Sequence, residues 1–418
     1  EGDWSGLYAS MSSPPRFLKL PGYAFDRERY WVQLHWPVVQ VTADGAGDDI
    51  VADTQYLQPA WEQHELPIPP NHVDAGGIET HVLICTGREL EEESLRLAMP
   101  ACSLAFIDTA GDDAASRYTA LASHSFAYVR ALLRGKGADR IRLQLVADDG
   151  DAGEWVLGMR GMLKSASIEE PRLEWQIVSL RENTPLDEIQ CRIRANLRAF
   201  ENESSVRYDQ AGRFVRRWEA VQAATTQNRA RPLRVGGAYL ITGGLGGLGR
   251  LFAGHILETV PDARVIVTGR AAAQPIDGDL AQWASTSRVM YRQLPLDRRE
   301  DVEALVASLH DEGMALRGIL HCAGQIADSY VVNKTDEAFA GVLAPKLLGT
   351  LHLDEATKDL DLDFFMLFSS IMAESGNAGQ ADYACANGFM DRYAAYRNGL
   401  AAKGLRRGHS VAIDWPLW

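Results

Sequence analysis

The chain has 418 residues, 46% of them hydrophobic and 23% charged, and it carries a formal net charge of −14. At roughly 150 residues per domain, this length predicts two or three domains, each able to bury a core. The negative charge argues against nucleic acids and anionic membranes as partners, because both attract clustered lysine and arginine.

Residues 1–54 are predicted to connect domains. Prolines and aromatic residues alternate as far as residue 38 without a sustained helical or strand period. The stretch 39–54 is small, acidic and glycine-containing, which is typical of a linker.

The segment 55–230 is predicted to form a first α/β unit. Three apolar runs have the length and composition of buried strands: 80–85, 141–147 and 173–180. A helical pattern over 116–134 separates the first two runs, and such alternation predicts a parallel sheet. No glycine-rich turn follows the first run, so we expect this unit to hold no nucleotide.

A second α/β unit is predicted over 231–418, after a polar stretch that contains Pro232. Its strand-like runs are 238–242, 264–269, 316–324, 364–370 and 409–415. Each run is separated from the next by enough residues for a crossover helix, and a long helical pattern covers 386–398.

A glycine-rich turn opens the second unit, between its first strand and an apolar helical stretch. The turn consists of Thr242, Gly243, Gly244, Leu245, Gly246, Gly247, Leu248 and Gly249. Glycines here let backbone amides reach a pyrophosphate at the helix N-terminus, where a Cβ would block it. Such turns also occur in unrelated α/β proteins, but the place between strand and helix favours a dinucleotide site. We therefore predict an α/β protein of two tandem Rossmann-like units, the first without a cofactor and the second binding a dinucleotide.

The end of the next strand indicates which dinucleotide is bound. An NAD site usually places an acidic residue there to accept the ribose hydroxyls. This chain has Arg270 instead, and a cation suits a 2′-phosphate. We predict NADPH as the cofactor; the alternative is that Arg270 is an ordinary surface arginine.

Ser370, Tyr383 and Asn387 stand at a spacing that resembles the short-chain dehydrogenase/reductase superfamily. Tyr383 follows Ser370 by 13 residues and precedes Asn387 by four, so in a helix Tyr383 and Asn387 share a face. The usual member has lysine where this chain has Asn387. That exchange resembles the ketoreductase domains of modular polyketide synthases, in which the lysine lies in a preceding helix. Lys346, in LAPKLLGT, matches that lysine.

The resemblance extends over the whole chain. It implies that the first unit is a truncated cofactor-free structural unit and that the second is the catalytic NADPH-binding unit. TGGLGGLG, HCAG, LAPKLLGT, FSSI, QADYACAN and IDWPLW are similar to family motifs and stand in family order. It implies that His321, Ala323 and Gly324 contribute to the cofactor site. The run LPGYAFDRERYW, residues 20–31, resembles the linker that follows a ketosynthase or acyltransferase region. The motifs are most similar to assembly lines served by separate acyltransferases.

The family resemblance implies NADPH-dependent reduction of a 3-ketoacyl group. The group would be carried by phosphopantetheine on an acyl carrier protein, with neighbouring synthase domains as further partners, the ketosynthase side through the linker. Ketone reduction needs a hydride, which the cofactor supplies, and a proton for the developing alkoxide. Free tyrosine, with a pKa of about 10, needs a nearby ammonium to do acid–base work near neutral pH. The resemblance implies that Tyr383 donates the proton and that Ser370 hydrogen-bonds the carbonyl oxygen. It also implies that Lys346 supplies the ammonium, and that Asn387 helps to hold the lysine and a proton-relaying water.

The stereochemical class is implied by the loop after HCAG. One family group has the pattern Leu-Asp-Asp there, and this chain keeps its last aspartate as Asp328. The opposite group carries a tryptophan where this chain has Ser375. The resemblance implies a B-type enzyme that makes the D-configured alcohol; Asp328 as an ordinary loop residue is the alternative.

Three departures from the family pattern affect these expectations. Cys385 replaces a proline that some B-type members carry. The aspartate that contacts adenine near position 295 is missing, so that contact is lost or shifted to Asp297. Members continue past the motif that ends at Trp418 into a segment covering the active site, so we expect part of that cover to be missing.

A cytoplasmic protein without metal is expected. The cysteines are odd in number, far apart and without CxxC spacing, which argues against disulfides and a zinc site: Cys85, Cys102, Cys191, Cys322 and Cys385. No apolar run of membrane-spanning length and no signal-peptide pattern stands in the sequence. Two other functions stay open. A stand-alone short-chain reductase would need neither linker nor cofactor-free unit, and a non-reducing structural module would be expected to lack the tyrosine, lysine or glycine turn.

Overall fold

The computed structural model describes residues 56–66, 77–87, 89–135, 139–147, 155–181, 183–202, 204–221, 233–272 and 275–416. The predicted connector over 1–54, the polar boundary at 222–232 and the last two residues lie outside the described residues. Residues 55–418 form one compact unit that contains two sheets. No helix in the described ranges is long and apolar enough to cross a membrane.

The first sheet has the strand order β1-β7-β6-β5-β4-β2-β3 within the described residues. The strands are β1 Tyr56–Gln63, β2 Ile78–Thr86, β3 Ser103–Asp108, β4 Arg140–Ala147, β5 Leu173–Ser179, β6 Ser204–Asp209 and β7 Gly212–Val221. The associated helices are α1 Glu92–Ala98, α2 Ala114–Arg134, the 3₁₀ helix η3 Trp155–Met159, α3 Arg160–Glu169 and α4 Leu186–Arg198.

The predicted parallel arrangement holds from β3 to β6 and differs at one edge. There β7 runs antiparallel to both β6 and β1. The reason is local: Asp209 pairs with Gly212 across a tight hairpin, and a short connection joins only antiparallel strands.

The second sheet is parallel throughout, with the order β10-β9-β8-β11-β12-β13 in the described part of the chain. Its strands are β8 Ala238–Thr242, β9 Arg264–Gly269, β10 Val289–Gln293, β11 Leu316–His321, β12 Phe364–Ser370 and β13 His409–Trp415. The helices are α5 Gly247–Thr259, the 3₁₀ helix η4 Gly278–Leu280, α6 Ala281–Ala284, α7 Arg299–Asp311, α8 Asp336–Ala356, α9 Met372–Ser375 and α10 Ala381–Ala402. This is the doubly wound Rossmann order, with its switch point between β8 and β11.

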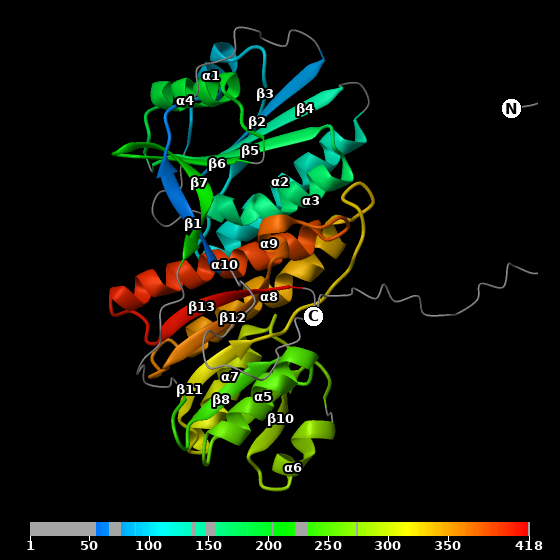
Figure 1. The fold of residues 1–418 in the computed structure, drawn as a ribbon, viewed down its shortest axis with the longest axis vertical. Helices are drawn as coiled ribbons and strands as arrows, with labels where there is room; N and C mark the ends of the chain where they lie inside the picture. Colours follow the sequence, from blue (N-terminus) through cyan, green and yellow to red (C-terminus); the bar gives the residue numbers. More distant parts are fainter. Residues whose placement is uncertain are drawn as a thin grey trace, which may run out of the picture. The chain divides into compact units, whose positions relative to one another are not determined.

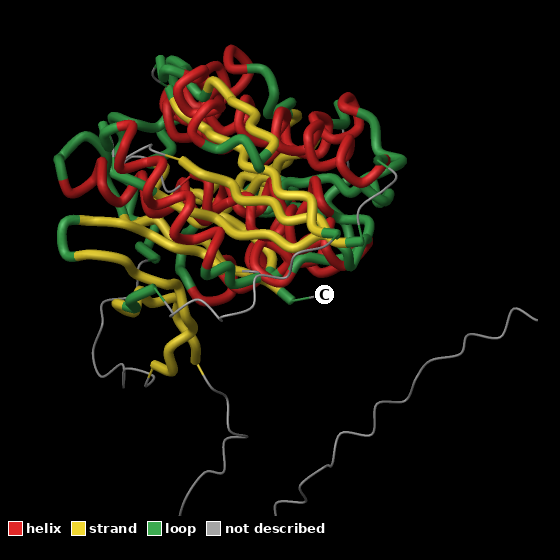
Figure 2. The backbone as a smooth tube through the Cα atoms, turned by 90° about the horizontal axis from the view of Figure 1, so that it is seen from above, coloured by secondary structure: helices red, strands yellow, loops and turns green. Residues whose placement is uncertain are grey.

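Helices α2, α3, α8 and α10 lie between the two sheets, as Figure 1 shows. In Figure 2 the strands, in yellow, are flanked by helices, in red. The rings of Phe126 in α2 and Phe339 in α8 stack with centroids 4.1 Å apart. A Cβ built on Gly388 of α10 would lie 2.3 Å from the carbonyl oxygen of Gly158 in η3, so the two backbones touch. One continuous hydrophobic core therefore joins the two α/β units.

Candidate active site

The glycine turn follows β8 and leads into α5. Gly243 has φ +64°, in the left-handed region that favours glycine, and its Cβ would lie 2.9 Å from Cα of Ala323. A Cβ on Gly249 would lie 2.6 Å from Cα of Gly244. A side chain at Gly243 or Gly249 would collide with the neighbouring backbone, and glycine at these positions lets the chain turn tightly into the N-terminus of α5.

A buried hydrogen-bonded chain holds the turn against β11. His321 Nε2 lies 3.1 Å from the carbonyl oxygen of Pro345, which can only accept, so Nε2 carries the proton. His321 Nδ1 then accepts from the hydroxyl of Thr242 at 2.6 Å. That hydroxyl in turn accepts from the amide of Ala323 at 3.3 Å. Burial lowers the pKa of His321 to about 3, so the ring is neutral and bridges Thr242 to Pro345 without adding a charge.

Two adjoining cavities lie at the carboxyl ends of the strands. The larger, about 790 Å³, is lined by glycines of the turn at one end and by Lys346, Ser370 and Tyr383 at the other. The smaller, about 490 Å³, is lined by Arg270 and Asp297. Both share the residues Gly243, Gly246, Cys322, Gly324 and Gln325. A cradle that side chains would fill, at the switch point of a doubly wound sheet, fits a dinucleotide.

Arg270 follows β9 directly and lines the smaller cavity. Its side chain is exposed, and Nη1 donates to Oε1 of Gln325 at 3.3 Å. Asp297 lines the same cavity, which is where the shifted adenine contact was expected. Arg270 therefore brings a positive charge to the wall of the smaller cavity.

Lys346 and Tyr383 lie on neighbouring helices, α8 and α10. Lys346 is 3% exposed, and Nζ lies 5.8 Å from the centroid of the Tyr383 ring. Nζ donates to the carbonyl oxygen of Phe368 at 2.8 Å and lies 3.4 Å from the sulfur of Met390. Burial lowers the pKa of Lys346 to about 8, so the amine stays mainly protonated at neutral pH beside the phenol.

Ser370 ends β12 and lines the larger cavity. Its hydroxyl donates to the carbonyl oxygen of Trp415 at 3.2 Å and can rotate toward a carbonyl oxygen in the cavity. Asn387 lies behind the cavity, where Nδ2 donates to the carbonyl oxygen of Tyr383 at 2.8 Å. Asn387 Oδ1 is buried with no partner in the described part of the chain, which leaves an acceptor for a water or an ammonium.

Of the predicted site residues, the structure brings most together around the two cavities. The residues that line them are Gly243, Gly246, Gly247, Leu248, Gly249, Arg270, Ala323, Gly324, Lys346, Ser370 and Tyr383. Thr242, Gly244, Leu245, His321 and Asn387 line neither of these two cavities. Asp328 does not either, but both its carboxylate oxygens accept from Nε2 of Gln380, at 3.3 and 3.1 Å, and Gln380 lines the larger cavity.

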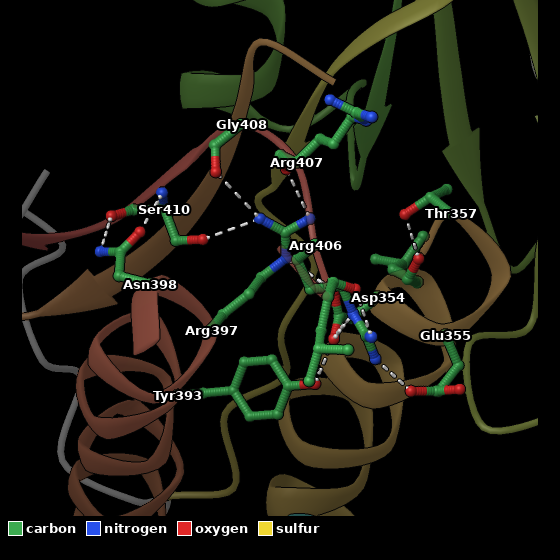
Figure 3. A network of polar contacts seen from close by, with 12 residues as sticks. Asp354, Glu355, Thr357, Tyr393, Arg397, Asn398, Arg406, Arg407, Gly408 and Ser410 are labelled. Carbon is green, nitrogen blue, oxygen red and sulfur yellow. Dashed lines mark hydrogen bonds and ion pairs between the residues drawn. The ribbon is translucent and has the colours of Figure 1, made fainter. Parts of the chain in front are cut away.

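Sequence reasoning missed a buried cluster that joins α8 to α10 and β13 (Figure 3), here called the Asp354 cluster. It consists of Asp354, Tyr393, Arg397, Arg406 and Ser410. Asp354, fully buried, accepts from Nε of Arg397 at 2.6 Å, from the hydroxyl of Tyr393 at 2.8 Å and from Nε of Arg406 at 3.0 Å. The cluster connects the helix of Lys346 to the helix of Tyr383. The available signal was spacing, since Asp354 stands eight residues after Lys346, on the same helix face.

Comparison with known proteins gives the family. A family model described as "KR domain" matches residues 237–418. Polyketide synthase PksN of Bacillus subtilis (strain 168) is 33% identical over 372 residues, 88% of this chain and 7% of that protein. Polyketide synthase PksL of the same organism is 36% identical over 381 residues, 90% of this chain and 8% of that protein. The chain thus spans less than a tenth of the length of these two relatives.

A solved structure extends the match over both α/β units. The crystal structure of a ketoreductase domain from the bacillaene assembly line has 32% sequence identity and a TM-score of 0.76. The match covers 87% of this chain and 85% of that one. The family resemblance found in the motifs is thereby confirmed. The chain belongs to the ketoreductase family of polyketide synthases, and its chemistry is the reduction of a β-keto group.

Proposed function

We propose that the chain uses NADPH to reduce a 3-ketoacyl group on an acyl carrier protein to the D-configured 3-hydroxyacyl group, as a B-type enzyme. The observation that carries the proposal is one cavity that is lined both by glycines of the turn before α5 and by Lys346, Ser370 and Tyr383. The cofactor would supply the hydride, and Arg270 would hold its 2′-phosphate.

The residues of the chain would then complete the reduction. Tyr383 donates its phenolic proton to the ketone oxygen while Ser370 donates a hydrogen bond to the same oxygen. The Lys346 ammonium, 5.8 Å from the phenol ring, stabilises the negative charge left on the phenol oxygen. The two partners of Lys346 Nζ, the carbonyl oxygen of Phe368 at 2.8 Å and the sulfur of Met390 at 3.4 Å, are both uncharged.

The carrier protein and the neighbouring synthase domains are part of this proposal. They are supported by relatives that are named polyketide synthases and exceed this chain more than tenfold in length. An assembly line served by separate acyltransferases is proposed from the motifs alone. The D-configuration is supported by Asp328, whose carboxylate orients Gln380 at the cavity wall.

The test follows NADPH consumption by absorbance with a 3-ketoacyl thioester, and resolves the alcohol by chiral chromatography. Tyr383→Phe removes the proton donor, and the rate should fall by about 100-fold or more. Tyr396→Phe is the matched control, because Tyr396 stands on the same helix, is partly exposed and lines neither cavity. A D-alcohol made by wild type and control supports the proposal. The L-alcohol would contradict the B-type assignment alone, and no turnover together with no NADPH binding would leave a non-reducing structural module.

A further inference from the structure

Helix α3 of the first unit presents one face to the segment that precedes Tyr383. Gly161, Ser165 and Glu169 are spaced four residues apart and therefore share that face. A Cβ on Gly161 would lie 2.5 Å from the carbonyl oxygen of Met372, so the backbones are in direct contact. The hydroxyl of Ser165 accepts from the amide of Asn377 at 3.0 Å. The first unit thus fixes the course of the chain between Ser370 and Tyr383.

Glu169, the last residue of α3, joins two loops that are far apart in the sequence. One carboxylate oxygen accepts from the amide of Gly379 at 2.8 Å, and the other accepts from the amide of Val331 at 2.6 Å. A carboxylate at the C-terminus of a helix is disfavoured by the helix dipole, and burial raises the pKa of Glu169. The position is therefore unfavourable for a carboxylate, and the hydrogen bonds from the amides of Gly379 and Val331 offset this cost.

The two loops that Glu169 joins both contribute residues that line the larger cavity, among them Ile326 and Gln380. The amide of Ser329 donates to the carbonyl oxygen of Gly379 at 2.9 Å, and Gln380 donates to Asp328 at 3.1 Å. Gln380 lines the cavity three residues before Tyr383. A change in the distance between the loops would therefore move Asp328 and Gln380 relative to Tyr383.

A buried ion pair supports the same loops from behind. Lys334 and Asp382 are both fully buried in their side chains, and Lys334 Nζ lies 2.5 Å from Oδ2 of Asp382. The same ammonium donates to the carbonyl oxygen of Ala327 at 2.6 Å. Lys334 thus connects the segment of Ala327 to Asp382 at the start of α10, and Glu169 joins the same two parts of the chain at Val331 and Gly379.

We propose that Glu169 is a positioning residue: by bridging Val331 and Gly379 it sets the gap between the two loops and thus the ketone face that the substrate presents. The proposal rests on the proposed reductase function. Glu169 lines neither cavity, so its effect is transmitted through the loops. The class of ligand it acts on is the acyl chain of the 3-ketoacyl thioester.

The test compares Glu169→Gln with Glu170→Gln. Glutamine keeps the size of the side chain but turns one carboxylate oxygen into a donor, which then faces an amide donor. Glu170 is the matched control, because it is the next residue and its carboxylate instead contacts Arg172. With a racemic 2-methyl-3-ketoacyl thioester, Glu169→Gln should lower kcat/KM about tenfold, since small misplacements of reacting groups are costly. The product should be a mixture of alcohols of D- and L-configuration. NADPH affinity should be unchanged in both variants.

Hydrogen–deuterium exchange supplies a readout that needs no turnover. Amides of 329–331 and 377–380 should exchange faster in Glu169→Gln than in Glu170→Gln, while those of β12 stay unchanged. Ser165→Ala, a milder variant, should affect 377–380 alone and shift the alcohol ratio less. An alcohol ratio and exchange that match the control would overturn the proposal. A wild-type chain that binds no NADPH and reduces nothing would instead overturn the proposed function and, with it, the stereochemical role of Glu169.

Discussion

The two α/β units begin alike and differ at the start of their first helix. In the first unit Gly87 follows β2, and helix α1 begins with Glu92 and Glu93 behind the N-cap Glu91. In the second unit Gly243 follows β8, and the first turn of α5 carries no acidic residue among its described positions. Carboxylates at a helix N-terminus satisfy its positive end and repel a phosphate, whereas bare amides attract one. We therefore propose that a few side chains decide which of the two units accepts a dinucleotide, and that the first unit binds none.

The first unit contributes to the site in a different way, by ion pairs and helix contacts. Glu374 of α9 accepts from Arg160 of α3 at 3.1 Å and from Arg216 of β7 at 2.5 and 2.8 Å. Glu374 stands between Ser370 and Tyr383 in the sequence. One unit thus carries the reacting groups, and the other holds the segment that separates them. Each prediction below tests one side of this division.

The largest expected effect concerns the Asp354 cluster, which lies wholly in the second unit. Asp354→Ala leaves the buried guanidinium of Arg397 without its carboxylate, and removing one partner of a buried pair costs about 3–5 kcal/mol. Urea unfolding should show this loss. Arg299→Ala is the control, because its ion pair with Glu303 is exposed and should contribute little to stability. A loss for Asp354→Ala no larger than that of the control would mean that the first unit alone holds α8 against α10.

Lys346→Met is expected to raise stability while it lowers activity. Burial lowers the pKa of Lys346 from 10.5 to about 8, which corresponds to a cost of up to about 3 kcal/mol at neutral pH. Methionine removes that cost, and kcat/KM should fall about 100-fold or more. Lys334→Met is the matched control and should lower stability instead, because it leaves Asp382 buried without its partner. Destabilisation by both variants would show that Lys346 is a structural residue.

The difference in stability between wild type and Lys346→Met should depend on pH, in a direction that follows from the pKa of Lys346. Between pH 8 and 10.5 the folded protein has released the Lys346 proton, whereas the unfolded chain still binds it. Stability rises with pH wherever the unfolded state binds more protons. The free energy of unfolding of wild type should therefore approach that of Lys346→Met across this window. Urea unfolding of both proteins at neutral pH and within the window should show the difference shrinking. A constant difference would contradict the assigned cause.

Short local motifs explain what the sequence could predict. The glycine turn was found because it stands between a strand and a helix, and Ser370, Tyr383 and Lys346 were found because their motifs resemble those of a known family. β10 was missed because it is an edge strand and only partly buried, so its apolar pattern is weak. Glu169 was missed because its partners lie 162 and 210 residues away, and nothing local distinguishes it from a solvated helix residue.

The next effect compares the two strand–turn–helix starts directly. Gly243→Ala forces a side chain into the left-handed region and to 2.9 Å from Ala323, which costs about 1–3 kcal/mol and should weaken NADPH binding accordingly. Gly87→Ala is its counterpart in the first unit, where the nearest atom to a Cβ is at 3.7 Å. Fluorescence titration with NADPH should therefore separate the two variants, with Gly87→Ala close to wild type. Equal weakening would mean that the first unit also takes part in cofactor binding.

The smallest expected effect concerns a single bond between the units. Tyr118 of α2 is fully buried, and its hydroxyl donates to the carbonyl oxygen of Cys385 in α10 at 2.7 Å. Tyr118→Phe removes this bond but keeps the ring against Phe389, so the loss should be about 1 kcal/mol. Because Cys385 stands only two residues after Tyr383, the rate is a sensitive readout of any shift in α10. Unchanged kcat with slightly lower stability would show that the first unit acts on the reaction through the loops bridged by Glu169. A fall in kcat comparable to that of Glu169→Gln would instead show that it acts through α10 as well, because a displaced helix would carry Tyr383 with it.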